Sequence, residues 1–559
     1  MALRYQGRFD EAYARFYKST WNGAWQEAGY FECARISLMQ GRLDDALYEI
    51  DRCLIRNTHN HKARALRATI LRHMGRGAEA LPFIEESLSI DPFNYGALYE
   101  KYLIAVDSET LNTLISLMRG ECHNYDETAL DYVAAGCHDE AAALWALAEK
   151  EGAVSPMTYY YLGWSRLVAG DKANAKAAFE KAAATPADCC FPNRPEAILA
   201  LRAAMEVNES DALAPLMLGN LYYDKRQYDL AVEAWERSSS LNPGSPMVWR
   251  NLALAYFNKL DRHDQALELM KRAFLLDTTD SRIFMELIQL LKRMEADAEG
   301  RLELMKRHAD LVGMRDDLVL EKATAQNLTG AYADALETID NRIFHPWEGG
   351  EGKVSGQYQF ARVELAKQSL AKGDYAEAIR LLEECLAYPH NLGEGKLEGA
   401  QDNDFHFLLG EAYAGAGDAE NARSHYEAAT LGPVEPAPAL YYNDAKPDKI
   451  FYQGMALLRL GRTDEARGRF HRLVNFGEKH IFDDTKMDYF AVSLPDLLIW
   501  EEDLNVLNRI HCNYMMALGH YGLGDKTHCR RYIDRTLELA PEHAGIRAFK
   551  SFIDLESGK

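Results

Sequence analysis

Long apolar runs are missing from this chain of 559 residues. No stretch approaches the roughly 20 apolar residues that a helix needs to span a bilayer. The first twenty residues also lack an apolar stretch after a basic start, which a secretory signal would show. Its nine cysteines include no Cys-x-x-Cys pair. These absences predict reduced thiols, no membrane span and a cytoplasmic location.

Basic residues are in deficit, because 63 Lys and Arg stand against 85 Asp and Glu, a net charge of −22. Binding to nucleic acid without regard to sequence needs clustered Lys and Arg. The charge balance therefore argues against a nucleic-acid partner. An excess of one sign also keeps a long, polar-faced chain soluble.

Signatures of catalysis and of cofactor binding are also missing. Gly-Glu-Gly-Lys occurs twice, but a phosphate loop has another spacing and a Ser or Thr after its Lys, whereas Val354 follows Lys353. His345, Glu348, Glu351 and Glu394 are residue types that can bind a metal, but no short His-x-x-x-His pair supports a metal site. The sequence predicts no catalytic residue, no metal and no cofactor, and it leaves open whether a larger parent protein is an enzyme.

What the chain does contain is one unit used many times: a Gly, and five residues later an Ala that opens an apolar helical pattern. Ala12 to Ala46 is 34 residues, and so is Ala46 to Ala80. A fixed period of this length indicates one supersecondary unit repeated along the chain. The unit occurs at Gly41/Ala46, Gly75/Ala80, Gly136/Ala141, Gly170/Ala175, Gly330/Ala335, Gly373/Ala378, Gly417/Ala422 and Gly461/Ala466.

Each unit predicts two short helices joined by a turn at the Gly. Small residues such as Gly163 and Ala175 are expected where the two helices cross, with Phe179 filling the space beside them. Gly170 is expected to end the first helix in a left-handed conformation. Equivalent small and aromatic residues are Gly219 with Trp235 and Gly410 with Tyr426.

These residues resemble the tetratricopeptide repeat, and about a dozen units can be recognised. The resemblance implies an all-α fold, a right-handed superhelical solenoid of helical hairpins in which each repeat packs on its neighbours. Segments near 93–120, 194–208 and 282–312 are helical but degenerate, and we expect divergent repeats there rather than linkers. Cys53, Cys385 and Cys529 occupy small-residue positions, where Cys packs as a small hydrophobe.

The repeat lengthens in the second half of the chain. The intervals after Ala335, Ala378 and Ala422 are 43, 44 and 44 residues, and Cys529 follows Ala466 by 63. Since the spacing within each helix pair is unchanged, the extra residues must lie between one pair and the next. We therefore expect regular and degenerate repeats over 1–343, then repeats with long loops over 344–559. The predicted loops are 344–358, 388–403, 431–448 and 477–509, with a C-terminal capping helix from Ala544 to Leu555.

Two successive inserts carry Gly-Glu-Gly-Lys, with the Lys 20 residues before the repeat Gly in the first and 21 in the second, so stacking should bring them together on one edge. Inserted loops often mark the binding face of a repeat protein. The alternative is that these loops are purely structural, with Glu351 paired to Lys353 and Trp347 packed over a neighbouring helix. The candidate binding surface comprises His345, Trp347, Glu348, Glu351, Lys353, Tyr358, Asn391, Glu394, Lys396, Tyr441, Tyr442, Asp488 and Tyr489.

A narrower resemblance comes from the amino-acid sequences of several segments: 218–224, 250–259, 344–353, 391–396, 441–448, 451–454 and 488–499. Together they resemble the C-terminal half of a family of large bacterial proteins. In that family an N-terminal β-sandwich half, similar to galactose mutarotases and of unknown function, precedes the repeats. The resemblance implies a carbohydrate-related context without assigning a reaction. It agrees with a first repeat that begins at its second helix, so we expect either that upstream sequence is missing here or that the first helix is supplied from elsewhere.

Two functions follow as hypotheses. The first is an interaction scaffold that binds a protein partner, its own missing N-terminal half or a second copy of the chain, since solenoids commonly serve recognition. The second is a carbohydrate-binding module whose insert loops complete a sugar site on the missing half, with Trp347 stacking on the sugar.

Overall fold

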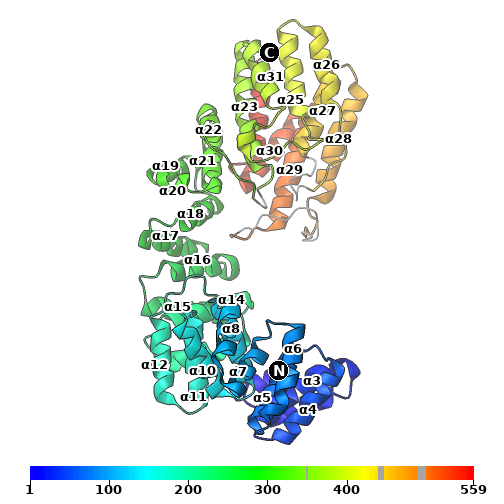
Figure 1. Cartoon of the computed structure of the whole chain (residues 1–559). Coiled ribbons are helices and arrows are strands. Elements are labelled where there is room, and N and C mark those ends of the chain that lie inside the picture. The colour runs from blue at the N-terminus through cyan, green and yellow to red at the C-terminus, as the bar shows by residue number, and fades with distance from the viewer. Residues whose placement is uncertain (348–349, 439–445, 487–498, 559) are drawn as a thin grey trace. The chain divides into compact units, whose positions relative to one another are not determined.

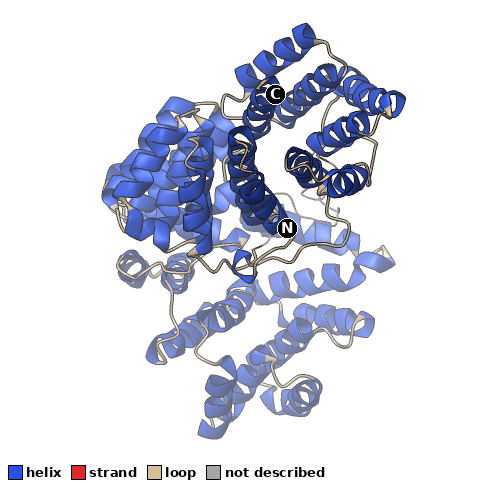
Figure 2. Cartoon of the chain, turned by 90° about the horizontal axis from the view of Figure 1, so that it is seen from above, coloured by secondary structure: helices blue, strands red, loops and turns tan. Residues whose placement is uncertain are grey.

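A computed structural model describes residues 1–347, 350–438, 446–486 and 499–558. Within these ranges every regular element is a helix, as Figure 2 shows. No helix in the described ranges is both long and apolar enough to cross a membrane. The contacts divide the chain into two compact units, Met1–Val248 and Trp249–Lys559. The change from regular to insert-bearing repeats predicted at residue 344 lies inside the second unit.

The first unit is built from helices, most of which pack against the next helix along the chain (Figure 1). They are α1 (Ala2–Tyr5), α2 (Phe9–Ser19), η1 (Gly23–Trp25), α3 (Gln26–Met39), α4 (Leu43–Arg56), α5 (His61–His73), α6 (Gly77–Ile90), α7 (Tyr95–Ala105), α8 (Ser108–Met118), α9 (Cys122–Ala134), α10 (His138–Lys150), α11 (Pro156–Val168), α12 (Lys172–Ala183), α13 (Pro195–Val207), α14 (Leu213–Asp224) and α15 (Tyr228–Leu241).

The second unit begins within α16 (Pro246–Leu260). It continues with α17 (His263–Leu276), α18 (Ser281–Arg293), α19 (Ala298–Arg307), α20 (Ala309–Gly313), α21 (Asp316–Leu328), α22 (Tyr332–Asp340), α23 (Lys353–Lys372), α24 (Tyr375–Glu384), η2 (His390–Leu392), α25 (Asn403–Gly415), α26 (Ala419–Ala429), α27 (Pro447–Arg459), α28 (Thr463–His480), α29 (Leu504–Gly522), α30 (Lys526–Leu539) and α31 (Ala544–Ser557).

The predicted turn at the repeat glycine is confirmed. All eight repeat glycines have positive φ, from 72° at Gly41 to 87° at Gly170. A side chain is strained in this conformation, which explains the preference for Gly. Three turns that lack the glycine hold Arg226, Asp261 or Glu295 at positive φ instead.

The predicted packing of small residues against aromatic rings is also confirmed. A Cβ atom on Gly163 would lie 2.5 Å from the Phe179 ring, and one on Gly410 would lie 2.5 Å from the Tyr426 ring. The same close approach recurs between Gly219 and Trp235. Each ring therefore occupies the volume that the missing side chain leaves free.

The degenerate segments are helical as expected, but one of them is not a hairpin. Helices α7 and α8 pair with each other over residues 95–118, and α18 to α20 cover the third segment. Residues 195–207 form the single helix α13, which packs between α11 and α14 without an antiparallel partner of its own. The expected divergent repeat at 194–208 is thus reduced to one helix.

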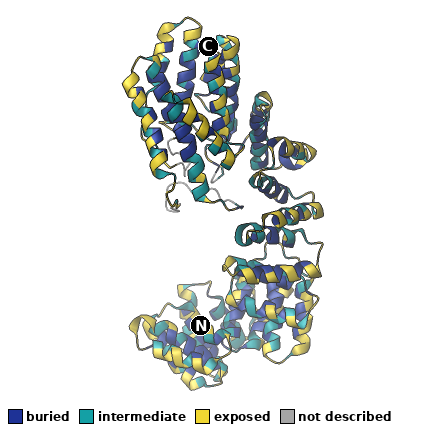
Figure 3. Cartoon of the chain, turned by 180° about the vertical axis from the view of Figure 1, so that it is seen from behind, coloured by how far each residue is buried: buried dark blue, intermediate teal, exposed yellow. Residues whose placement is uncertain are grey.

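The inner surface of the C-terminal repeats is formed by the first helix of each pair. Helices α23, α25, α27 and α29 contact one another in this order, and α31 contacts both α29 and α23. We call these five helices the inner ring; the labels of α23, α25 and α31 lie together in Figure 1. Figure 3 shows that buried residues concentrate on the faces where helices of a unit meet.

Candidate functional site

The second insert supplies a cap for the helix that follows the first insert. The Glu394 carboxylate accepts hydrogen bonds from the backbone N–H groups of Gly352 (2.8 Å) and Ser355 (2.9 Å), at the start of α23. The first N–H groups of a helix have no partner within the helix, and a carboxylate there also complements the helix dipole. The two Gly-Glu-Gly-Lys motifs therefore meet, as predicted, and Glu394 stabilises α23.

Asn391 and Lys396 have matching structural roles. The Asn391 amide donates to the backbone carbonyls of Ile339 (3.0 Å) and Arg342 (3.2 Å) at the end of α22. The Lys396 ammonium donates to the Leu386 carbonyl (2.8 Å) after α24 and pairs with Asp402 (2.6 Å). Both residues satisfy carbonyl groups at helix ends, which otherwise lack partners.

Of three further candidates, Trp347 and Tyr358 pack into the fold, whereas the His345 side chain is largely exposed. The Trp347 indole packs against buried Gly350, where a Cβ atom would lie 2.3 Å from it. Tyr358 is buried in the core, with the Arg362 guanidinium over its ring. His345 contacts Asp316, whose carboxylate lies 3.0 Å from Nδ1. Residues 353–358 were predicted as loop, but they form the first turns of α23, so Lys353 and Tyr358 are helical.

The insert edge does enclose space. Glu351 and Glu394 line a cavity of about 500 Å³, together with Tyr388 and Glu398. Lys353 lines a neighbouring cavity of about 510 Å³, with Trp500 and Lys446. Glu348, Tyr441, Tyr442, Asp488 and Tyr489 lie outside the described residues.

A different cavity, of about 340 Å³, opens within the inner ring. Helices α23, α25, α27, α29 and α31 all contribute to its wall. We call it the inner cavity; its aromatic wall includes Phe360, Phe405, Phe451, Tyr452, Tyr514 and Phe549, and its polar wall includes Glu364, Lys367, Asp404, Lys449, His511 and His543.

The charged groups of this wall are buried in pairs. Glu364 and Lys367 lie 2.7 Å apart and are 3% and 4% exposed. Lys449 pairs with Asp404, and its ammonium lies 4.7 Å from the centre of the Phe405 ring. Burial disfavours the charge of Lys449, but the nearby carboxylates, Asp404 above all, outweigh burial and raise its pKa.

Three hydrogen-bond donors of the wall are open to the cavity. Tyr452 and Tyr514 are 7% and 8% exposed, and within the described part of the chain neither hydroxyl has a hydrogen-bond partner. Burial, followed by the carboxylates of Asp404 and Asp448, raises the pKa of both hydroxyls well above the ordinary value, so they stay protonated.

His543 is the third donor. Burial, with His511 second, lowers the pKa of His543 to about 4, so its ring is neutral at pH 7. Its Nδ1 accepts from the Ile546 N–H (3.1 Å) at the start of α31. The proton of the neutral ring is therefore on Nε2, which becomes a donor.

The first unit also has a cavity, of about 230 Å³; the His61 Nδ1 atom in its wall is buried without a partner, but several of its other polar groups are already paired within the fold. Arg35 pairs with Asp131 (2.7 Å), and Lys62 pairs with the same carboxylate (2.9 Å). The Tyr132 hydroxyl donates to Glu100 (2.9 Å). These pairs leave it less suited to a polar ligand than the inner cavity.

Among the described residues, three groups bring possible metal ligands together: His73, Cys137 and Glu140; Cys122, His123 and Asp126; and His520, Asp525 and His528. Each contains groups already engaged within the fold. Glu140 binds Arg72 (2.9 Å), Asp126 accepts from Trp145 (2.9 Å), and Asp525 caps α30 while accepting from His528 (2.7 Å).

Sequence reasoning missed the inner cavity, although a signal was present. Glu364, Lys367, Asp404 and Lys449 stand on first helices of repeats, at positions that the structure buries. Charged residues are almost never fully buried unless they are paired. A charged residue at an inward repeat position therefore indicates a specific polar contact, and four of them indicate a polar wall.

Comparison with known families supports the repeat assignment. One tetratricopeptide-repeat model matches residues 216–275 and 363–436, and a second matches residues 157–185 and 450–475. The matched ranges include helices of both units.

Solved repeat proteins show similarity at low identity. The structure described as YrrB, a tetratricopeptide-repeat protein with an unusual peptide-binding site, is 16% identical; the match covers 42% of this chain and 95% of that one, with a TM-score of 0.17. MamA from Desulfovibrio magneticus RS-1 is 17% identical over 35% of this chain and 97% of that one, with a TM-score of 0.22. The P58(IPK) repeat domain is 16% identical over 78% and 99%, with a TM-score of 0.19. The helical hairpins in the matched ranges are therefore similar to tetratricopeptide repeats, within a fold that is all-helical in the described residues.

Proposed function

We propose that this chain is an interaction scaffold that holds a peptide segment of a protein partner in the inner cavity. The two tyrosine hydroxyls that are open to the cavity, on Tyr452 and Tyr514, carry the proposal. Each hydrogen bond from such a hydroxyl to a ligand would contribute about 0.5–1.5 kcal/mol. Repeat solenoids commonly use their concave surfaces for recognition.

The wall suits peptide backbone. Its open donors are two hydroxyls and the Nε2–H of His543, and the groups that such donors seek are carbonyl oxygens. Beside them, Phe405 and Phe549 offer apolar surface for a side chain. A cavity of about 340 Å³ holds a few residues rather than a domain. We infer an extended segment that presents carbonyl oxygens and one large apolar side chain.

The test compares peptide binding by the full chain and by a Tyr452→Phe/Tyr514→Phe double variant, which removes two oxygen atoms and keeps the rings. Peptides are first selected from a displayed random library on the unaltered chain. At about 0.5–1.5 kcal/mol for each hydrogen bond, the double variant should bind 5- to 150-fold more weakly. Tyr125→Phe is the matched control, because the Tyr125 hydroxyl is buried without a partner elsewhere, in the first unit.

Equal binding by the double variant and by Tyr125→Phe would overturn the placement of the peptide. A glycan array run with the same proteins separates the carbohydrate hypothesis. If the library yields no peptide, and the unaltered chain binds a glycan that the tyrosine double variant does not bind, the ligand of the inner cavity is a sugar and not a peptide. The insert loops are a weaker location for a sugar, because Trp347 packs on Gly350 and Glu394 caps α23.

A further inference from the structure

The C-terminal helix α31 does not follow the stacking of the repeats before it. In a solenoid each repeat contacts its neighbours. Helix α31 contacts α29 and α30, but it contacts α23 more extensively, although α23 lies in a much earlier repeat. It thus closes the inner ring and covers a surface that α23, α25 and α27 would otherwise expose.

One stripe of α31 makes the apolar contacts. Ile546, Phe549, Phe552 and Leu555 are buried at a spacing of three residues, whereas Arg547 and Lys550 are exposed. The Phe552 ring lies 5.6 Å from that of Phe451 and 5.5 Å from that of Tyr452, between ring centres. Anchors at helical spacing in an apolar groove are typical of a helix bound as a ligand.

Two charged residues of α23, Glu364 and Lys367, form a polar clamp that binds the same helix, α31. The Lys367 ammonium donates to the Ala548 carbonyl (2.8 Å) and to the Ser551 hydroxyl (3.1 Å). Ser551 in turn donates to Glu364 (2.7 Å). At the far end, Glu556 pairs with Arg459 (2.8 Å).

One part of this clamp does not depend on α31. Glu364 and Lys367 lie one turn apart on α23 and bind each other directly at 2.7 Å. The inner cavity next to the start of α31 gives water a route to both charges. A permanent core would gain more from apolar residues here, since buried ion pairs rarely add net stability.

We propose that α31 is an exchangeable helical ligand of the inner ring, so that the ring recognises an amphipathic helix with this pattern of anchors. The surface of α23, α25 and α27 that α31 covers binds α31 of its own chain in the structure described here. Once that α31 has dissociated, the same surface would bind an identical helix from solution. The inference holds whether or not a peptide occupies the inner cavity.

The experiment uses the full chain with a protease site inserted between Ala540 and Pro541, in the connection from α30 to α31. The folded chain is cleaved, and a fluorescent peptide of residues 541–559 is added in excess. We expect the labelled peptide to replace the cleaved segment within hours, seen as a rise in anisotropy and a mass change in native mass spectrometry. Circular dichroism should show that the rest of the helices remain.

Competing peptides provide the matched controls. Phe552→Ala removes a buried ring and should weaken competition by about 100-fold or more, whereas Lys550→Ala changes an exposed residue and should leave competition within about twofold. The Tyr452→Phe/Tyr514→Phe chain should still bind the 541–559 peptide, which separates this inference from the proposed function. Absence of exchange over several days, or unfolding of the ring once α31 leaves, would show that α31 is a permanent part of the core.

Discussion

Replacing Glu394 by Ala removes the carboxylate that joins the second insert to the start of α23. The change deletes two hydrogen bonds, to the N–H groups of Gly352 and Ser355, which are 42 and 39 residues away in the sequence. Hydrogen bonds to charged groups contribute about 1.5–3 kcal/mol, and loss of a helix cap costs about 0.5–2 kcal/mol. Because both estimates describe the same contacts, we expect a total near 2–3 kcal/mol.

Hydrogen exchange at the first amides of α23 measures this loss locally. A chain with two units need not unfold in one step, so a single midpoint would mix several transitions. A loss of 2–3 kcal/mol should speed exchange at Ser355 by about 30- to 150-fold. Glu394→Gln keeps one oxygen acceptor and should show a smaller effect.

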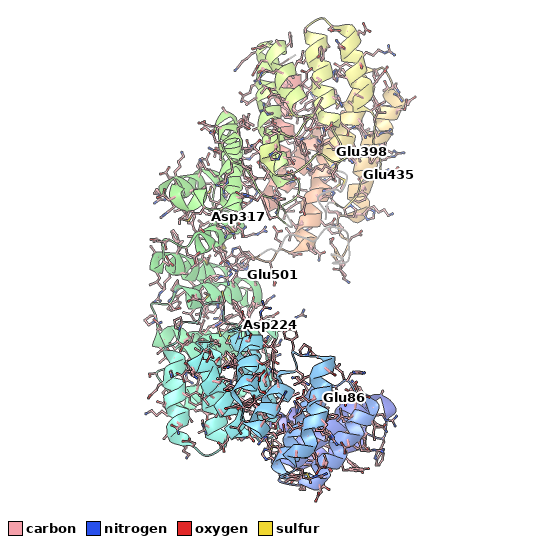
Figure 4. All side chains as sticks on the ribbon, in the orientation of Figure 1. Glu86, Asp224, Asp317, Glu398, Glu435 and Glu501 are labelled. Atoms are coloured by element: carbon pink, nitrogen blue, oxygen red, sulfur yellow. The ribbon has the colours of Figure 1, made fainter. Side chains whose placement is uncertain are left out.

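Glu398→Ala is the matched control. Glu398 lines the same cavity but is exposed, and it is among the labelled side chains of Figure 4. Exchange at Ser355 should stay within threefold of the unaltered chain in this variant. If Glu394→Ala and Glu398→Ala had the same effect, the second insert would not act as a cap, and its carboxylates would again be candidates for ligand binding.

Two other predictions concern the fold of the C-terminal repeats. Gly410→Ala should destabilise the repeat by about 1–3 kcal/mol because its Cβ would lie 2.5 Å from the Tyr426 ring. Gly468→Ala, with open space at its Cβ, should instead stabilise helix α28 by about 0.5–1 kcal/mol. Hydrogen exchange of α25 and of α28 measures the two effects locally, and equal effects would contradict the packing argument. His543 has its pKa lowered to about 4 in the folded chain, from an ordinary value near 6.5, so the unfolded chain binds more protons between these values and stability should fall by up to about 3 kcal/mol as the pH drops from 6.5 to 4. Hydrogen exchange of α31 across this range should show the loss, His543→Gln should flatten it, and an unchanged slope in that variant would assign the effect to another group.

Much of the repeat architecture could be predicted because it depends on neighbours in the sequence. The turn at Gly170 needs a left-handed residue, and the ring of Phe179 needs the missing side chain of Gly163. Both requirements act within one hairpin, so a period in the sequence is enough to reveal them. The sequence predicted a divergent repeat at 194–208, whereas the structure has the single helix α13 there. This helix packs on both α11 and α14, so its residues show no pattern of a two-helix hairpin.

The candidate site was harder to predict because it joins distant segments. From the sequence, Glu394 and Trp347 could equally contact a ligand or support the fold; the structure turns Glu394 to the start of α23 and Trp347 to Gly350. Tyr452 and Tyr514 read as ordinary repeat positions, and only the closed inner ring places both hydroxyls at one cavity.

The sequence by itself determined the helical hairpins, their glycine turns and the positions of the long inserts, since each of these rests on short-range geometry. Only the tertiary structure decided what the inserts contact and how α31 returns to α23 to close the inner ring. That closure depends on how the small rotation of each repeat adds up along the solenoid, and no local pattern of residues records such a sum.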